Sequence, residues 1–423
     1  MRANKRQLII LAGAAVLLII AASLLARLSH NALTFTKQTV APTVFTDAAA
    51  YGNDSLVFSN GRALATYNYQ TGASSLLTAD DILGSTDTVD QVEASADKRY
   101  VLFHVDHTTN DSQLSAILQA DGSDSNGTYW WVYDTVGKTF HHLPDAPSIK
   151  IDGSKLYTMD SDQDNRQVIT TYSLPDGAQV AQNFMPEADD FFIGKGGFLL
   201  SVSADSGHGQ QIAQTADGTV SNTLFDNATL NNVAPNKRYG LGTLRNGKDR
   251  DLVLFDLQQK SSRVIGRDVV GNFDQLGDNS VLYNAGNSSS PTLYLYSAST
   301  GKSRPIDFPH GFVKNGVTVT PTLLLSSTAA IVQLPNAPYL AGTNIAPIKT
   351  IDPNYDKLID TAQGPVEITY YPDQNAFIVS IRDSSQRQAV YNQLRKDGYD
   401  PDLLQIRFSL FTPPSHDPNS TGL

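Results

Sequence analysis

Three aspartates at alternate positions raise the question of a metal site. Asp160, Asp162 and Asp164, in DSDQDNRQVITTYSLPDG, occupy positions 1, 3 and 5 of a hand-type calcium loop, whose oxygen ligands converge on a hard cation. Position 6 is Asn165, where the sharp turn prefers glycine, and position 12 is Thr171, which has no carboxylate. We predict a turn between strands. A weak calcium site at the three aspartates is the alternative, and no other cofactor is expected.

Histidines form a second candidate metal site. FHVDHTT places His104, Asp106 and His107 close together, and His141 and His142 follow later in the chain. Two histidines and a carboxylate can bind zinc. Only His104 and Asp106 share a strand face, however, because side chains alternate along a strand. We therefore expect surface polar residues, with zinc as the alternative.

Trp130 and Trp131 are adjacent and must point to opposite faces of their strand. We expect one of them in the core. The other is a candidate for partner binding or for stacking on a sugar, with a second core position as the alternative.

The chain has no cysteine, which excludes a disulfide, a thiol nucleophile and a thiolate metal site. It also lacks G-x-S-x-G, so a serine peptidase with a nucleophile elbow is not expected.

The N-terminus predicts a membrane anchor. Residues 8–26 carry no charge, and as a helix they would span roughly 28 Å, close to the thickness of a bilayer core. Arg2, Lys5 and Arg6 precede this segment, which predicts a cytoplasmic N-terminus and a single-pass cell-membrane protein whose bulk is extracytoplasmic. A cleaved signal peptide is the alternative. We assign residues 1–27 to the tip and anchor and residues 28–39 to a linker.

The charge of the remaining chain narrows the choice of partners. The formal net charge is −11, and removing the three positive charges before the anchor leaves −14. Nucleic acid and an anionic membrane surface are therefore not expected as partners. The membrane contact is expected through the N-terminal helix alone.

Beyond the anchor, short strand-like segments end in turns at nearly constant spacing. After the first unit, successive turn residues lie 40 to 42 positions apart, and a further step of 41 from the last reaches Gly342. A mostly aromatic column stands four or five residues before each turn, which suits a half-buried strand position. The turn residues are Gly72, Gly137, Gly177, Gly218, Lys260 and Gly301. The column consists of Tyr67, Tyr133, Tyr172, Ala213, Phe255 and Tyr296.

A second column of strands repeats with the same period: DSLVF, KRYVLF, GSKLYT, GGFLLS, KRYGLG, NSVLY and TPTLLLSS. A repeat of about 41 residues with several strands has the size of one four-stranded propeller blade. We predict a mainly β protein with a seven-bladed propeller over residues 40–345, six or eight blades being the alternatives. The segment from Val40 to Ala48 is the expected closing strand.

One unit carries a resemblance to a known family. IDGSKLYTMDSDQDNRQVITTYSLPDG resembles the TolB-type, WD-like propeller repeat in its Asp152-Gly153 turn, its acidic loop with Asp162, Asp164 and Asn165, its Tyr172 and its Asp176-Gly177 turn. SADKRYVLF and APNKRYGLG, with Lys98 and Lys237, are similar to the same segment. The resemblance implies a fold. It implies no chemistry, because such propellers serve as scaffolds, as binding modules and as non-catalytic domains of peptidases.

The second unit carries an insertion of about 15 residues within the loop from Asp106 to Thr128, between its second and third strands. Loops on a rigid scaffold are frequent binding sites, so this loop is a candidate. A tolerated polar insertion is the alternative.

The C-terminal region departs from the repeat. Residues 346–412 predict a linker followed by a ββαβ module: two strands across the turn 372–375, a helix capped by Asp383 and Gln386 and stopped at Gly398, and a last strand from Leu403. Residues 413–423 are typical of a disordered tail.

Two functions from different classes fit this organisation. The first is a membrane-anchored, extracytoplasmic propeller that binds another envelope or extracellular protein or acts as an envelope scaffold. The alternative is a carbohydrate-active hydrolase or lyase with paired carboxylates in the propeller funnel, or a sensor of a small ligand. The sequence favours a non-enzyme but does not identify the ligand.

Overall fold

A computed structural model of the chain describes residues 37–410 apart from 53, 109–111, 144–145, 147, 162–163, 165, 175–176, 186–187, 203–210, 216–220, 247–248, 268–273, 286–291, 306–319, 325–328, 335–336 and 343–344. The expected anchor, Asp162 and the tail 413–423 lie outside the described residues. Within the described part of the chain, no helix has the length and apolar character needed to cross a membrane.

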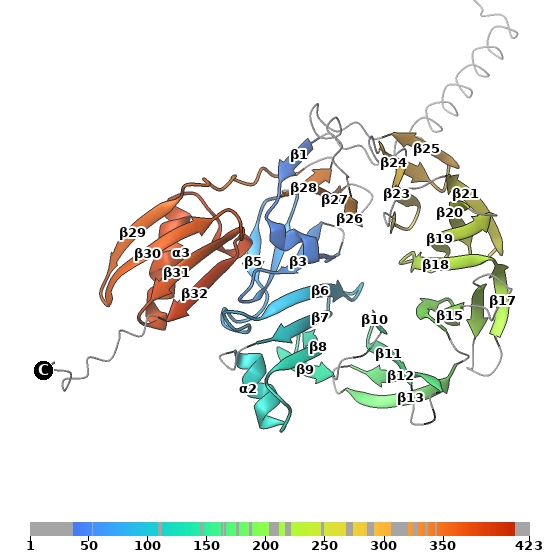
Figure 1. Ribbon diagram of the computed structural model, residues 1–423, viewed down its shortest axis with the longest axis horizontal. Helices are drawn as coiled ribbons and strands as arrows, with labels where there is room; N and C mark the ends of the chain where they lie inside the picture. The colour runs from blue at the N-terminus through green and yellow to red at the C-terminus, as the bar shows by residue number, and fades with distance from the viewer. Residues whose placement is uncertain are drawn as a thin grey trace, which may run out of the picture.

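Between Lys37 and Gly342 the described residues form seven four-stranded antiparallel sheets arranged around a ring (Figure 1). The first strand of each sheet lies nearest the centre and the fourth at the rim. Sheet 1 contains β2 (Ala49–Ala50), β3 (Ser55–Ser59), β4 (Leu64–Asn68) and β5 (Ser74–Leu76). Sheet 2 contains β6 (Thr88–Ala94), β7 (Tyr100–His107), β8 (Gly127–Asp134) and β9 (Thr139–Leu143). Sheet 3 contains β10 (Ser148–Asp152), β11 (Lys155–Ser161), β12 (Gln167–Ser173) and β13 (Ala178–Phe184).

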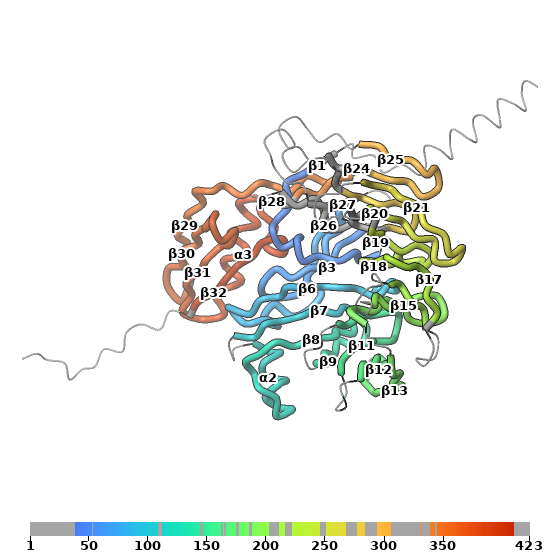
Figure 2. Tube along the Cα trace, turned by 45° about the vertical axis from the view of Figure 1, so that its right-hand side comes forward, coloured from blue at the N-terminus to red at the C-terminus, as the bar shows by residue number. Residues whose placement is uncertain are grey.

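The remaining sheets continue around the ring in chain order (Figure 2). Sheet 4 contains β14 (Asp190–Gly194), β15 (Gly197–Val202), β16 (Gln211–Thr215) and β17 (Ser221–Asp226). Sheet 5 contains β18 (Ala228–Val233), β19 (Tyr239–Asn246), β20 (Asp249–Asp256) and β21 (Ser261–Gly266). Sheet 6 contains β22 (Asp274–Leu276), β23 (Ser280–Ala285), β24 (Thr292–Ser297) and β25 (Lys302–Pro305). Sheet 7 contains β26 (Thr320–Leu324), β27 (Ala329–Leu334), β28 (Ala337–Gly342) and, from the start of the chain, β1 (Lys37–Val40).

The strand that completes sheet 7 is β1, which pairs antiparallel with β28. This strand lies in the segment that we expected to be a linker, so the predicted closing strand, Val40 to Ala48, is wrong. Most of that segment is instead the 3-10 helix η1 (Thr43–Asp47). The reason is geometric, because the chain must cross from the rim at β1 to the centre at β2 within a few residues. Phe45 makes this crossing fully buried, with its ring 4.9 Å from that of Phe58.

The turn residues other than Gly218, which lies outside the described residues, follow the third strands, and the aromatic column lies on those strands. In the column, Tyr67, Tyr133, Phe255 and Tyr296 are all buried. One assignment was wrong: TPTLLLSS, taken as equivalent to the second strands, forms β26, the first strand of sheet 7. The error arose because this segment has the same apolar character as the second strands of the other units.

The core consists of apolar clusters between neighbouring sheets, and alternate residues of one strand serve opposite neighbours. On β7, Val101, Phe103 and Val105 pack toward sheet 1, whereas Tyr100 and Leu102 pack toward sheet 3. Such clusters line both faces of sheets 1 to 5, because the side chains of a strand alternate in direction. This packing makes each sheet depend on its neighbours, as expected for radially repeated units.

The insertion in sheet 2 is confirmed between the second and third strands, and it is folded. It contains the helix α2 (Gln113–Ala120), whose Leu114 and Leu118 are fully buried in the cluster between sheets 1 and 2. The side chain of Ser112 caps the helix by accepting a bond of 3.0 Å from the backbone nitrogen of Ser115. The amphipathic segment QLSAILQA thus forms part of the core rather than a loose polar insertion.

Replacing Ser112 by alanine is expected to lower the free energy of unfolding by about 1 kcal/mol, because the first turn of α2 loses its cap. Urea denaturation of the variant and the wild type measures this loss. Ser384→Ala is the control, since the Ser384 side chain is exposed. A Ser112 variant as stable as the wild type would contradict the cap.

The C-terminal module contains one more strand than we predicted. Its sheet has the order β29 (Asp356–Thr361), β30 (Gly364–Tyr371), β31 (Ala376–Ile381) and β32 (Ile406–Leu410), with β32 parallel to β31. The sequence predicts a linker where β29 lies, because the short alternating pattern of this strand is recognisable only beside its partner β30. The expected capping box of Asp383 and Gln386 is present in η2 (Ser384–Gln386), and α3 (Arg387–Lys396) buries Val390 and Leu394 against the sheet. The last element, η3 (Pro401–Leu403), precedes β32.

Candidate functional site

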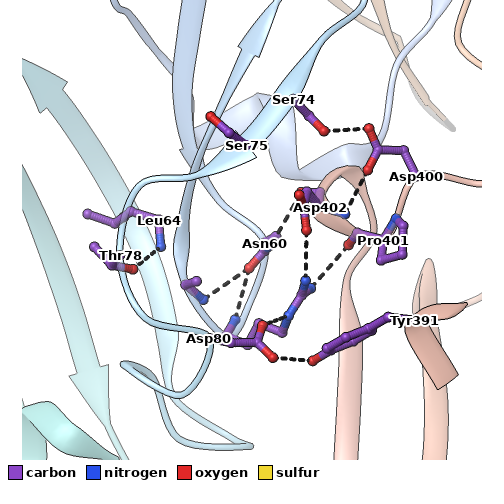
Figure 3. Close-up of polar contacts among 12 residues, drawn as sticks. Asn60, Leu64, Ser74, Ser75, Thr78, Asp80, Tyr391, Asp400, Pro401 and Asp402 are labelled. Carbon is purple, nitrogen blue, oxygen red and sulfur yellow. Dashed lines mark hydrogen bonds and ion pairs between the residues drawn. The ribbon is translucent and has the colours of Figure 1, made fainter. Parts of the chain in front are cut away.

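The module meets the ring at a joint built from sheet 1, η3 and α3 (Figure 3). From sheet 1 come the turn between β3 and β4, with Asn60 and Arg62, and the segment after β5, with Asp80. From the module come Asp400 to Asp402, at η3, and Tyr391 of α3. Leu403 adds an apolar contact, since it packs into the cluster of Phe45 and Tyr67.

Arg62 is the centre of this joint, and its side chain is only 5% exposed. Its Nε bonds to Asp80, while its two terminal nitrogens bond to the carbonyl of Pro401 at 3.1 Å and to Oδ1 of Asp402 at 3.3 Å. The guanidinium carbon lies 4.7 Å from the centroid of the Tyr391 ring. The Tyr391 hydroxyl donates to Oδ2 of Asp80 at 2.5 Å. A planar guanidinium suits this combination of bonds and stacking, which lysine cannot reproduce.

Asn60 and Ser74 complete the joint on the ring side. The Asn60 side chain donates to the carbonyl of Asp402 at 3.2 Å and accepts from the backbone nitrogens of Arg62 and Ala63. Ser74 bonds to the carboxylate of Asp400. The turn that carries Arg62 is therefore held by the same side chain that binds the module.

The charges at the joint are unequal, because Asp80, Asp400 and Asp402 surround one buried arginine. Burial, together with the charge of Asp400, raises the pKa of Asp402 above its usual value despite the opposing effect of Arg62. Burial also raises the pKa of the Tyr391 hydroxyl, which keeps it protonated as a donor. The arrangement can clamp two folded parts together.

Sheet 2 holds a second polar array, in which His107 is fully buried between Asp87 and Trp131. Nδ1 of His107 lies 3.1 Å from Oδ2 of Asp87, and the Trp131 indole nitrogen donates to Nε2 at 3.0 Å. Since Nε2 accepts, the proton of the neutral ring is on Nδ1 and is donated to Asp87. Burial opposes ionisation of Asp87, but the bonds from His107 and from the backbone nitrogens of Gly84 and Thr108 lower its pKa. The expectation that His107 is a surface residue is therefore wrong, because these partners hold it in the core.

A third polar group lies at the inner edge of sheet 2. Nδ1 of His104 is 2.7 Å from Oδ1 of Asp90, and Asp90 stands at the β-bulge between Val89 and Gln91. Burial raises the pKa of Asp47, in η1, to about 6; the bond from Thr46 opposes this shift and the charge of Asp90 adds to it. A carboxylic acid with a raised pKa beside a carboxylate is a potential proton donor.

The pKa of Asp47 gives a testable pH dependence. Because the pKa is about 6 in the folded state against an ordinary 3.8, its contribution to stability is complete below pH 4 and is lost as the pH rises through 6. Asp47→Asn is expected to be more stable than the wild type at pH 7, by roughly 1 kcal/mol after allowance for partial exposure, and equally stable at pH 4. Denaturation of the variant and the wild type at both pH values measures the difference between their free energies of unfolding. The same difference at pH 4 and at pH 7 would contradict the raised pKa of Asp47.

The structure describes two of the three candidate calcium ligands, Asp160 and Asp164. Asp160 lies at the end of β11 and Asp164 in the turn that follows, where its carboxylate pairs with Arg166. Among the described residues, which exclude Asp162, no group of three or more histidines and carboxylates is placed to hold a metal ion. His104, His107 and His142 each face a different aspartate instead of a shared centre.

No protein-family model matches the chain, and no curated protein matches it. Solved structures do resemble it. A structure from a study of two prolyl endopeptidases has a TM-score of 0.50 at 11% identity and covers 81% of this chain and 54% of that chain. The propeller domain of the Trilobed protease from Pyrococcus furiosus has a TM-score of 0.47 at 12% identity and covers 70% of this chain and 91% of that chain. TolB from Acinetobacter baumannii has a TM-score of 0.37 at 10% identity, with 74% and 65% covered.

The ring of sheets is a β-propeller. At these identities the likeness concerns the fold alone. This chain spans little more than half of the prolyl endopeptidase chain.

The propeller explains why both tryptophans are buried. Trp131 is 0% exposed and packs toward sheet 1, while Trp130 is 5% exposed and packs toward sheet 3. Sheet 1 covers one face of sheet 2 and sheet 3 covers the other. A side chain on either face of this strand is therefore buried. The structure therefore shows the alternative, a second core position, for the tryptophan that was a candidate for binding a partner or a sugar.

Sequence reasoning did not find the joint. Arg62 and Asp402 are separated by 340 positions, and nothing in the local pattern around SNGRALA indicates that the arginine is buried. The only available signal is an arginine in the turn between two strands of a predominantly acidic chain.

Proposed function

We propose that the protein is a membrane-anchored, extracytoplasmic, seven-bladed propeller that binds another envelope or extracellular protein, with the C-terminal module as its second contact surface. The seven sheets and the closing strand β1 support the blade number. The uncharged segment 8–26 and its basic flank support the anchor.

The observation that carries this proposal is a module that is fixed at the joint while one face of its sheet stays open. α3 covers the face of Val366 and Ile368. On the opposite face Leu358 is 68% exposed and Tyr371 is 43% exposed. Leu358 and Tyr371 offer apolar surface that a partner could cover, and a rigid mounting lowers the entropy lost on binding.

Affinity capture with the full chain in detergent tests this proposal. The wild type is expected to retain a specific protein from envelope extract, and the double variant Leu358→Asp, Tyr371→Asp is expected to lose it. The matched control is Val136→Asp, at an exposed turn of sheet 2. Capture of no specific protein, or equal capture by the double variant, would count against the module as a contact surface.

A further inference from the structure

A cavity of about 240 Å³ lies at the outer edge of β9, the rim strand of sheet 2 (Figure 1). Four consecutive residues of this strand, 140–143, line it, although their side chains alternate between the two faces of the sheet. Its walls also come from both faces. Ile117 of α2 packs against the cluster between sheets 1 and 2, whereas Leu156 and Leu174 belong to the cluster between sheets 2 and 3. The cavity therefore passes around the edge of the strand.

The backbone of β9 presents hydrogen-bonding groups at this edge. In an antiparallel ladder, the N–H and C=O of one residue point to the same side, and successive residues alternate. The backbone nitrogen of Thr135, just after β8, donates at 2.8 Å to Arg99, just before β7. Residue 134 and every second residue before it therefore bond to β9, where they face residues 139, 141 and 143. Phe140 and His142 lie between these positions, so their N–H and C=O groups point to the open edge.

β9 has few of the features that protect other rim strands from pairing. Exposed strand edges are templates for a further strand, and proteins usually block them with lysine, proline, a very short strand or a cover. β25 carries Lys302, Arg304 and Pro305, and β5 has three residues and contacts η3 of the module. β9 has five residues, TFHHL, with no lysine, arginine, carboxylate or proline. In the described part of the chain its one strand neighbour is β8. Its edge is therefore competent to pair with an added strand.

The two sides of the cavity differ in chemistry. On the side of sheet 3 the walls are aliphatic, from Val132, Leu143 and Leu156. On the side of α2, Ile117 is joined by Asp121, whose side chain is 55% exposed. An added strand sends alternate side chains to these two sides. Pockets for drug-sized ligands are usually larger, about 300–1,000 Å³, so this cavity suits the side chains of an extended segment better than a cofactor.

Charge indicates the kind of segment that fits. The formal net charge of the chain is −11, so a second copy is repelled, whereas a basic segment is attracted to the side of Asp121. Residues 411–423 of the same chain carry three prolines, Pro413, Pro414 and Pro418, which cannot donate to a ladder. A segment of another protein with basic and aliphatic residues in alternation meets both requirements.

We propose that the edge of β9 binds such a segment of the partner protein as a fifth strand of sheet 2. Its backbone pairs with Phe140 and His142, its aliphatic side chains face sheet 3, and its lysine or arginine side chains face Asp121. This assignment rests on the proposed protein-binding function and specifies the conformation and charge of the bound segment. It does not involve the open face of the C-terminal module.

The probe is the acetylated and amidated peptide KVKVK. We would label the full chain in detergent with ¹⁵N-histidine, titrate it with the peptide and record the backbone amide signals of His141 and His142. Saturable shifts are expected with a Kd on the order of 1 mM, typical of so small a ligand. At ten times the Kd, hydrogen exchange should slow about 10-fold at His142. It should not change at His141, whose N–H already bonds to β8. The peptide EVEVE should bind at least about 10-fold more weakly, because its carboxylates meet Asp121.

N-methylated peptides test the ladder itself. Methylation of the lysine nitrogens removes one alternate set of backbone donors, and methylation of the valine nitrogens removes the other. One set faces β9 and the other faces away, so exactly one of the two peptides is expected to bind at least about 10-fold more weakly than KVKVK. Equal affinity of the two methylated peptides would overturn the added strand.

A pair of variants tests the same donor on the protein side. His142→Pro removes the edge N–H and leaves the ladder to β8 intact, since proline is tolerated where the N–H of an edge strand points outward. It is expected to lose the peptide, while His142→Ala, which keeps the N–H, is expected to retain it. If His142→Pro does not fold, the methylated peptides decide the question on the wild type.

Three results on the wild type would overturn the assignment: no saturable binding of KVKVK, binding without slower exchange at His142, or equal binding of EVEVE. The proposed function is tested separately. If the peptides fail but the full chain still captures a partner that the variant Leu358→Asp, Tyr371→Asp loses, the edge assignment is wrong and the proposed function stands.

Discussion

Replacing Arg62 by alanine is expected to detach the C-terminal module from the propeller. The change leaves the carboxylates of Asp80 and Asp402 at the joint without their cation and removes the contact with the Tyr391 ring. Breaking a buried ion pair from one side typically costs about 3–5 kcal/mol. Limited proteolysis should therefore cleave between residues 346 and 355 much faster than in the wild type, and the module should unfold in a separate thermal transition.

Two further variants give this prediction its controls. Arg166→Ala removes an arginine from an exposed pair with Asp164 and should change stability by less than about 1 kcal/mol. Arg62→Lys keeps the charge but not the planar fork, so it should be intermediate. If Arg62→Ala keeps the wild-type cleavage pattern and a single transition, the remaining contacts, such as those of Asn60, Ser74 and Leu403, suffice to hold the joint, and the role given to Arg62 is wrong.

The second large effect is expected at Trp131. Trp131→Phe creates a cavity between sheets 1 and 2 and leaves Nε2 of the fully buried His107 without its donor. An unsatisfied buried group costs about 1–3 kcal/mol and the lost ring volume adds to this, so we expect a total loss of roughly 2–4 kcal/mol. Guanidinium denaturation followed by far-UV circular dichroism measures the change.

Trp130→Phe is the matched control, because it removes the same ring volume between sheets 2 and 3 without touching the bond to His107. The difference between the two variants isolates the contribution of the indole–imidazole bond. Equal losses would mean that only packing matters at these positions. A larger loss at Trp130 would contradict the role given to His107.

The repeat could be predicted from the sequence because it depends on local signals. The turn residues Lys260 and Gly301 adopt positive φ, and the column residues before them, Phe255 and Tyr296, are buried, so both signals reflect the hairpin itself. The C-terminal helix was predictable for the same reason, since its capping box and Gly398 act within a few residues. β1 and β29 could not be found in this way, because each is defined by a partner strand and not by its own pattern.

The polar sites escaped prediction because their partners are distant. His107 was read as a surface residue beside Asp106, whereas its actual partners are Asp87 and Trp131. The burial of both tryptophans follows from sheets that cover each other on both faces, which is a property of the assembled ring. Side-chain alternation predicts opposite faces correctly, but it cannot say whether a face is open.

The pairing of Lys37 with Gly342 means that the ring of sheets can close only after nearly all of it has been synthesised. β1 is the first propeller strand along the chain, and its partner β28 is the last to be synthesised. Until residue 337 has emerged, β1 has no neighbour, and bringing the two ends together carries the loop entropy of the whole intervening chain. A chain stalled before that point leaves β1 and β27 without their shared partner strand. Unpaired strand edges are templates for aggregation, so translation speed and edge-covering chaperones bear directly on the yield.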